Sequence, residues 1–388
     1  MGALRRLLAV SATLAVLSVG LASAALASAA SVTLSASETT VPFGAEVTLS
    51  GAVSPAAGAE TVQILDDTGA VVAKATTDGS GSYSVAITPD RELTLHAVWQ
   101  TAESDPVTLL VRSAVTVRMS AVRLFDTVTI RGKVAPAVPG ASVRVSLVRA
   151  GEQVATATPR MGSAGGFDAT FRVMQPGAYR GRASFADETH LRGSALDGPS
   201  TTPLPSLREG SHSVYVGLLE RRLVELHYRL VAVDHQFDFR TADAVVAFRK
   251  EQRMERVFTV DEGVWRALAD PFVPKPRLDV RAFHIEVDQT RQLLYTVQDH
   301  EVTNILHISS GKPSTPTHDG SFRVARKIAG FSANHLYYPS FFDGNRAIHG
   351  WTEVPTYPAS HGCVRVPYWN AKWIYGLAPI GTRVIVYH

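Results

Sequence analysis

One β-rich pattern occurs twice in the first half of the chain, and this repeat constrains the fold more than any other feature. Val47-Thr48-Leu49-Ser50-Gly51 is matched by Val128-Thr129-Ile130-Arg131-Gly132, and Tyr83 is matched by Phe167, with a period of about 81 to 84 residues. Both copies alternate apolar and polar residues over short runs bounded by Gly, Pro, Asp and Ser. This pattern is typical of antiparallel strands in a β-sandwich.

The repeat therefore predicts two sandwich modules that resemble the immunoglobulin-like modules of bacterial surface proteins, at residues 31–112 and 113–200. The first holds 3 basic and 10 acidic residues, whereas residues 113–205 hold 11 and 6, which supports separate modules. A chain of 388 residues is long enough for several domains. Nothing in either copy indicates catalysis, so we interpret both as spacers.

Residues 1–29 have the three parts of a secretory signal peptide. The parts are the basic pair Arg5-Arg6, the apolar run 7–21, and the small-residue cleavage sites Ala22-Ser23-Ala24 and Ala27-Ser28-Ala29. The alternative is an uncleaved membrane anchor, but a spanning helix needs about 20 predominantly apolar residues. We expect cleavage, no membrane span in the mature chain, and secretion into the cell wall or periplasmic space.

The net charge gives no indication of a nucleic-acid partner. The formal net charge is +3, and removal of the two leader arginines brings the mature chain to about +1. A net charge this close to neutrality does not support nucleic-acid binding. We expect a monomer with no nucleic-acid partner.

A small all-α module is predicted at residues 206–270. Apolar residues recur at helical spacing from Val216 to Leu226 and again from Ala244 to Phe248. Thr241 stands before the second run and is the predicted helix cap. Prolines at 271, 274 and 276 mark a linker.

This segment resembles the three-helix peptidoglycan-binding module. The matching residues are Leu223, Tyr228, Phe237-Asp238, Thr241, Ala244-Val245, Phe248 and Trp265-Arg266-Ala267-Leu268. His227 and Arg249 depart from the pattern, where Gly and Gln are usual. Because the matched positions are core positions, glycan binding and plain spacing both remain open.

The last segment, residues 279–388, returns to β structure. Residues 284–288 and 292–297 alternate as strands, 304–308 continue the sheet, 371–378 form a short helix, and 383–387 form a final strand. The fold class is therefore multidomain and mostly β, with two sandwiches, a β-rich final domain and the small helical module.

The last segment also carries Cys363, the one cysteine of the chain. His349 and His361 precede it closely, and Gly362 adjoins it. An imidazole beside a thiol can take its proton and lower the thiol pKa well below about 8.5. The spacing therefore predicts a nucleophilic thiolate, with a structural cysteine flanked by capping histidines as the alternative.

The residues around Cys363 closely resemble the L,D-transpeptidase (YkuD-type) catalytic domain over about residues 279–388. The matching motifs are Ile348-His349-Gly350, Ser360-His361-Gly362-Cys363, Ser309-Ser310-Gly311, Thr315-Pro316-Thr317 and Gly320-Ser321-Phe322.

The resemblance assigns roles to individual residues. It implies that Cys363 is the nucleophile, that His349 is the general base and that the Gly350 carbonyl orients its imidazole. It also implies that His361 supports the loop and that the N–H groups of Gly362 and Cys363 form an oxyanion hole.

Three further residues are candidates for binding substrate. Ser360 and Tyr338 are two of them. The third is Arg365, which is expected either to pair with a substrate carboxylate or to support the site from behind.

The function implied is an exported peptidoglycan L,D-transpeptidase, an acyltransferase that carbapenems target. Its cysteine would form a thioester with a donor stem tetrapeptide, and the side-chain amine of an acceptor stem would resolve it into a 3→3 cross-link. No metal or cofactor is implied. The alternatives are an L,D-carboxypeptidase that resolves the same thioester with water, and a non-catalytic wall-binding protein.

Overall fold

The computed structural model describes residues 29–388, so the predicted signal peptide lies outside the described residues except for its last position. Chain contacts divide the molecule into two compact units. One is formed by the chain up to Arg112 together with Asp187–Leu191, and the other by the remaining residues. None of the helices in the described part of the chain is long and apolar enough to cross a membrane.

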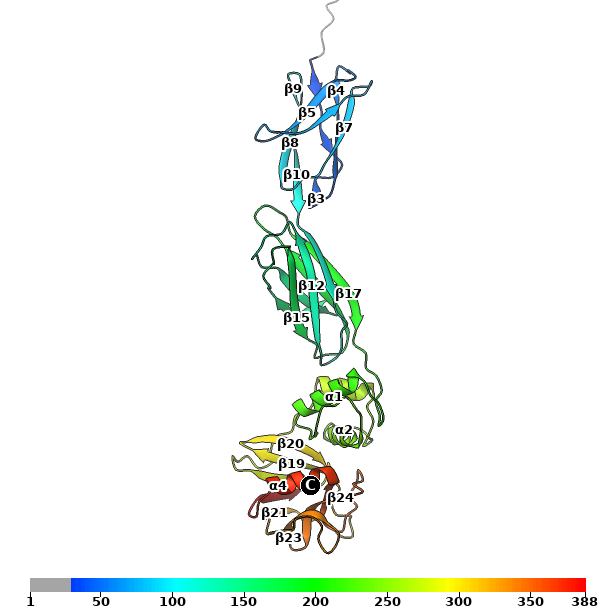
Figure 1. Cartoon of the computed structure of the whole chain (residues 1–388), viewed down its shortest axis with the longest axis vertical. Coiled ribbons are helices and arrows are strands. Elements are labelled where there is room, and N and C mark those ends of the chain that lie inside the picture. Colours follow the sequence, from blue (N-terminus) through cyan, green and yellow to red (C-terminus); the bar gives the residue numbers. More distant parts are fainter. Residues whose placement is uncertain (1–28) are drawn as a thin grey trace, which may run out of the picture. The chain divides into compact units, whose positions relative to one another are not determined.

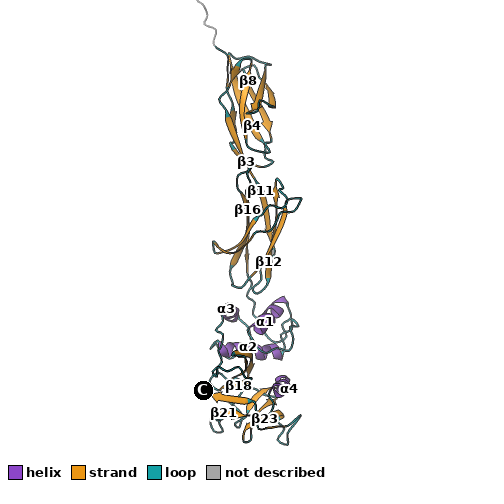
Figure 2. Ribbon diagram, turned by 90° about the vertical axis from the view of Figure 1, so that its left-hand side faces the viewer, coloured by secondary structure: helices purple, strands orange, loops and turns teal. Residues whose placement is uncertain are grey.

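The first unit is a β-sandwich. One sheet has the order β1-β4-β2 with β7 on β4, and the other has the order β3-β10-β8-β5-β6 with β9 on β8 (Figures 1 and 2). Leu49, Ile64 and Leu95 are fully buried in its core. The strands are β1 Ser31–Val32, β2 Ser35–Ala36, β3 Thr40–Pro42, β4 Val47–Ser54, β5 Thr61–Asp66, β6 Val71–Thr76, β7 Ser82–Ile87, β8 Leu93–Trp99, β9 Ala102–Glu103 and β10 Val107–Arg112.

The second sandwich repeats this architecture in the other unit. A sheet of order β11-β12-β15 faces one of order β14-β13-β16-β17 across a shared apolar core. The two predicted sandwiches are thus confirmed as folds, whereas their relation to immunoglobulin modules stays a prediction. The strands are β11 Ala114–Met119, β12 Thr127–Ala135, β13 Arg144–Arg149, β14 Glu152–Ala157, β15 Gly166–Arg172, β16 Ala178–Phe185 and β17 Gly193–Thr201.

The repeated glycine and aromatic residues have one physical explanation. Gly51 pairs with Tyr83 across β4 and β7, and Gly132 pairs with Phe167 across β12 and β15. A Cβ on Gly51 would lie 2.6 Å from the Tyr83 hydroxyl, and one on Gly132 would lie 2.4 Å from the Phe167 ring. In each copy the missing side chain leaves the space that the aromatic ring covers.

The helical module consists of α1 Val214–Glu225, α2 Phe239–Glu251 and α3 Glu262–Ala269. The predicted cap of the second helix is wrong: Asp238 is the N-cap, and its carboxylate accepts from the N–H groups of Arg240 and Thr241. Thr241 lies inside the helix, buried, and its hydroxyl donates to Glu220 at 2.9 Å. An aspartate one residue before the helix is the better cap because its carboxylate reaches two unpaired N–H groups.

The catalytic segment contains two sheets and one helix. The sheet of order β20-β19-β18-β26-β21 lies beside the sheet of order β22-β23-β24-β25. The elements are β18 His284–Asp288, β19 Leu293–Gln298, β20 Glu301–His307, β21 Gly320–Arg323, β22 Arg326–Lys327, β23 Tyr337–Asp343, β24 Arg346–Trp351, β25 Val364–Pro367, α4 Tyr368–Leu377 and β26 Arg383–Tyr387. The predicted helix at 371–378 therefore begins three residues earlier than expected.

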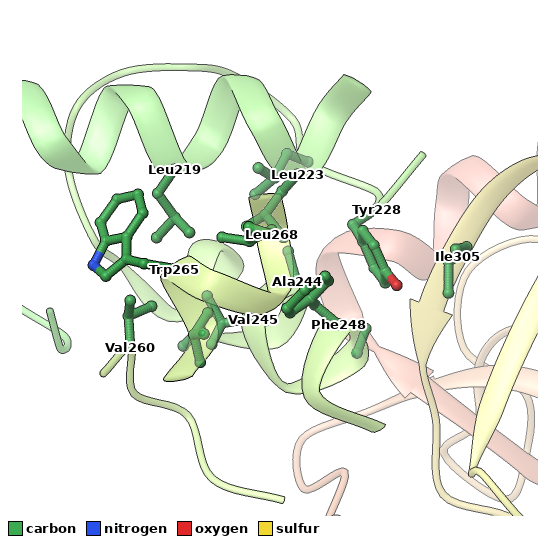
Figure 3. Close-up of a cluster of buried hydrophobic side chains, with 14 of the residues drawn as sticks. Leu219, Leu223, Tyr228, Ala244, Val245, Phe248, Val260, Trp265, Leu268 and Ile305 are labelled. Carbon is green, nitrogen blue, oxygen red and sulfur yellow. The ribbon is translucent and has the colours of Figure 1, made fainter. Parts of the chain in front are cut away.

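The helical module and the catalytic segment share one hydrophobic core, although the sequence treats them as separate domains. Figure 3 shows Tyr228 and Phe248 of the helical module beside Ile305 of β20. Tyr228 also forms a parallel bridge to Ile305, and the Ile305 N–H donates to the His227 carbonyl at 2.8 Å. The module therefore packs as a structural part of the final domain.

Buried polar contacts reinforce this junction. The Glu251 carboxylate accepts from the Tyr295 hydroxyl at 2.6 Å. The Lys250 ammonium is buried and donates to the Gln292 carbonyl at 2.9 Å, the Ile308 carbonyl at 3.1 Å and His307 Nδ1 at 2.6 Å. Because buried polar groups are costly unless paired, these contacts fix how α2 lies on β19 and β20.

Candidate active site

Strand register brings the two predicted catalytic residues together. His349 lies in β24, and Cys363 immediately precedes β25, which runs parallel to β24 with His349 opposite Arg365. Ile348 and Val364 point into the core. Because side chains alternate along a strand, His349, Cys363 and Arg365 lie on the face opposite to Ile348 and Val364. His349 is directly opposite Arg365, and Cys363 is two positions before Arg365.

The His349 imidazole is held in one tautomer. It is 2% exposed, and its Nδ1 lies 3.0 Å from the Gly350 carbonyl, which can only accept, so Nδ1 donates. Burial, together with the charge of Arg365, lowers the pKa of His349 to about 4, although the hydrogen bond to Gly350 acts in the opposite direction. The ring is therefore neutral at pH 7, with a free Nε2 that can accept a proton.

Close packing requires a glycine at position 350, the residue whose carbonyl accepts from His349. A Cβ at this position would lie 2.7 Å from the Cβ of Ala371 in α4 and 3.1 Å from the Tyr337 ring. The helix and the strand thus approach closely behind the site, which fixes the carbonyl that orients His349.

The expected low pKa of the thiol is wrong. Burial raises the pKa of Cys363, and the Ala347 N–H, Arg346 and Arg365 only partly oppose that effect. The Ala347 N–H donates to Sγ at 3.5 Å. A neutral imidazole provides no positive charge that would stabilise the thiolate. The resting pair is therefore a thiol beside a neutral base.

A second segment, Ser309–Thr317, holds the loop that carries Cys363. Ser309 and Arg365 exchange backbone hydrogen bonds at 2.9 and 3.1 Å, and the Lys312 N–H donates to the Ser360 carbonyl at 2.9 Å. The buried Thr317 hydroxyl donates to the Gly362 carbonyl at 3.0 Å and accepts from the Gly311 N–H at 2.9 Å. The motif that the sequence marked only by resemblance thus supports the loop that carries Cys363.

Ser360 also positions this loop. It is buried, its hydroxyl accepts from the Gly362 N–H at 3.1 Å, and it donates to the Cys363 carbonyl at 2.5 Å. Its one donor hydrogen is thereby used inside the protein, and the residue is 1% exposed, so the structure does not place Ser360 where it was predicted to contact substrate. The same contact occupies the Gly362 N–H, which was expected to be an oxyanion donor.

The remaining predicted residues lie around this centre. His361 is exposed, and its Nε2 accepts from Lys312 at 3.3 Å, away from the buried pair. Tyr338 is half-buried in β23 and stacks edge-on against Tyr337 and Tyr375. The Arg365 guanidinium lies 5.2 Å from the Trp351 ring centre, and within residues 29–388 it has no side-chain hydrogen-bond partner.

The sequence missed a charged cluster next to Cys363. Asp343 Oδ2 lies 3.2 Å from Arg346 and 2.9 Å from His318 Nδ1, and Arg346 donates to His318 Nε2 at 2.9 Å. The Gly344-Asn345 pair that joins β23 to β24 is the signal that could have found it, because a two-residue turn sets Asp343 opposite Arg346.

The described residues contain no group of three or more His, Cys, Asp or Glu placed to hold a metal ion. What the site offers is a buried neutral base, a thiol on the same face and an unpaired guanidinium. This combination suits nucleophilic attack on a carbonyl group.

The comparisons with known proteins agree with this chemistry. The sequence profile of the L,D-transpeptidase catalytic domain (YkuD) matches residues 282–386. The solved segment, residues 123–326, of an L,D-transpeptidase from Xylanimonas cellulosilytica is 32% identical over 49% of this chain and 100% of that segment, with a TM-score of 0.45. The catalytic domain of the Enterococcus faecium L,D-transpeptidase is 28% identical over 28% of this chain and 98% of its own, with a TM-score of 0.25.

No curated protein matches the chain. The profile matches residues 282–386, and the sequence is 32% identical to the Xylanimonas enzyme over the whole of its solved segment: the chain belongs to the L,D-transpeptidase family.

We predict that Gly362→Ala abolishes most acylation of Cys363 without unfolding the protein. Gly362 has a φ of +107°, and a Cβ there would lie 2.8 Å from Arg346 Nε. Displacing the nucleophile by about 1 Å can cost about 10²-fold in rate. Gly381→Ala is the matched control, because φ is +92° there but nothing lies within 4 Å. Equal acylation rates in the two variants would contradict this view of Gly362.

We predict that the alkylation rate of Cys363 depends on pH as expected for a residue that is a neutral thiol at pH 7. Alkylation of Cys363 should rise only as pH approaches and passes the ordinary thiol value of 9.0. Enzymatic acylation needs His349 unprotonated, so it should persist in mild acid and fall only near pH 4. Measuring the alkylation rate and the acylation rate across the pH range tests both expectations. An alkylation midpoint below pH 7 would mean that Cys363 is a thiolate at rest.

Proposed function

We propose that the protein is a peptidoglycan L,D-transpeptidase that acts through a thioester on Cys363. The observation that carries the proposal is the shared face of His349 and Cys363, with His349 Nδ1 tied to the Gly350 carbonyl. That hydrogen bond leaves Nε2 as the proton acceptor. Since the thiol is neutral at rest, proton transfer to Nε2 accompanies attack of Sγ on the carbonyl.

The substrate in this proposal is a donor stem tetrapeptide. Sγ attacks the carbonyl of the third residue, at the L-centre of diaminopimelate, and D-Ala leaves with the proton that His349 took up. The Cys363 N–H is the proposed oxyanion donor, because the Gly362 N–H already donates to Ser360. The unpaired Arg365 guanidinium is the proposed partner of a substrate carboxylate.

The second half-reaction resolves the thioester. The side-chain amine of an acceptor stem attacks the thioester carbonyl, the C–S bond breaks, and a 3→3 cross-link forms. His349 takes the proton from the attacking amine and returns it to the sulfur. Attack by water instead would give carboxypeptidase activity from the same intermediate.

We further propose that the protein is exported, because its substrate is wall material and its first 29 residues have the parts of a signal peptide. N-terminal sequencing of protein recovered from the culture medium or wall should begin near residue 25 or 30. Recovery of Met1 in a membrane fraction would contradict cleavage.

Mass spectrometry with a disaccharide-tetrapeptide tests the chemistry. The wild type should show a thioester adduct that has lost D-Ala and should yield a cross-linked dimer. Cys363→Ala should give neither, and His349→Ala should acylate about 10²- to 10⁴-fold more slowly. An adduct on Cys363→Ala would refute the nucleophile, and a product consisting only of tripeptide would identify a carboxypeptidase.

A further inference from the structure

A groove of about 420 Å³ lies between α2 of the helical module and the catalytic domain. Four aromatic residues and a single carboxylate dominate its walls, together with Val354. The aromatic residues are Phe239, Trp351, Tyr368 and Trp369, and the carboxylate is Asp243. Phe239 is 51% exposed, which is unusual for so large an apolar side chain on a helix that otherwise packs inward.

The groove is held open by contacts from both sides. Asp243 Oδ2 accepts from the Trp369 indole N–H at 2.8 Å, which joins α2 to α4. The Val354 carbonyl accepts from His307 Nε2 at 2.7 Å, and His307 in turn accepts from the buried Lys250. These groups are ordered before any ligand arrives, so a ligand would not have to organise them.

The groove adjoins the catalytic pair. The Trp351 and His349 rings are perpendicular, with centroids 5.6 Å apart, and the Arg365 guanidinium lies 5.2 Å from the Trp351 ring centre. Trp351 follows Ala347, the residue that contacts Cys363 Sγ, by four positions along β24. At about 3.3 Å per residue, the groove begins about 13 Å from the nucleophile.

This spacing matches the donor. The stem contains three residues between its attachment point and the carbonyl that Sγ attacks. Three residues of extended chain span about 10 Å. The next group is the sugar to which the stem is attached. If the carbonyl of the third stem residue lies at Sγ and the stem runs along β24, the sugar of the donor lies at the groove.

The walls also suit an amino sugar. The apolar C–H faces of a sugar ring pack on aromatic side chains, which bind amphipathic groups well. Within residues 29–388, Asp243 Oδ1 has no hydrogen-bond partner, so it can accept from a sugar hydroxyl or acetamido N–H. Burial raises the pKa of Asp243 to about 6, yet the carboxylate remains mostly ionised at neutral pH.

We propose that this groove is the subsite for the N-acetylhexosamine that carries the donor stem, with Phe239 and Asp243 contributed by the helical module. The inference rests on the proposed function, and it assigns a glycan contact to a composite site that neither domain forms alone. It also answers the question that the sequence left open, since the module both stabilises the catalytic domain and binds glycan.

The test compares two donors, the disaccharide-tetrapeptide and the same tetrapeptide without sugar, by their single-turnover acylation rates at subsaturating donor. The wild type should prefer the sugar-bearing donor. Asp243→Asn retains an acceptor for Trp369 but removes the charge, and should reduce that preference by about tenfold. Phe239→Ala should reduce it about threefold to tenfold. Both variants should lose less of their rate with the free tetrapeptide than with the sugar-bearing donor.

Phe272→Ala is the matched control, because Phe272 is equally exposed, at 56%, and does not line the groove. It should leave both rates unchanged. Equal losses with both donors, or no loss with either, would overturn the subsite. Failure of the wild type to acylate with any donor would instead refute the proposed function, so the two failures are distinguishable.

Discussion

The catalytic centre depends on the parallel pairing of β24 and β25. This pairing sets His349 opposite Arg365 and directs both residues, with Cys363, away from the core. A shift of one residue in either strand would turn one partner inward. The register is secured by the Ser309–Thr317 segment, which bonds to the backbone on either side of Cys363, and by the close approach of α4 to Gly350.

The electrostatic character of the site follows from its burial. Desolvation favours the neutral forms of both His349 and Cys363, so both side chains are uncharged at neutral pH. The positive charges of Arg346 and Arg365 partly oppose this effect on the thiol. In the proposed reaction, His349 would therefore take the proton as Cys363 attacks the carbonyl.

The helical module is joined to the final domain by a shared core and by buried hydrogen bonds. Its Tyr228 and Phe248 belong to the same core as Ile305 (Figure 3), and Lys250 extends a buried chain of hydrogen bonds through His307 to the loop at Val354. This loop lies between the strand of His349 and the turn of Cys363. The module therefore supports the active site structurally, and the groove lined by Phe239 and Asp243 gives it direct access to a ligand.

The sequence alone determined the fold class, the two sandwiches, the final strands and the family, because short-range periodicity and a contiguous motif carry that information. It also marked Cys363 and His349 as the candidate catalytic pair, since their motif residues are close along the chain. Only the tertiary structure decided the neutral state of the pair, the internal role of Ser360, the Asp343–Arg346–His318 cluster and the shared core. Each of these depends on burial or on contacts between distant segments, and a pattern of neighbouring residues contains neither the local dielectric environment nor the packing partners.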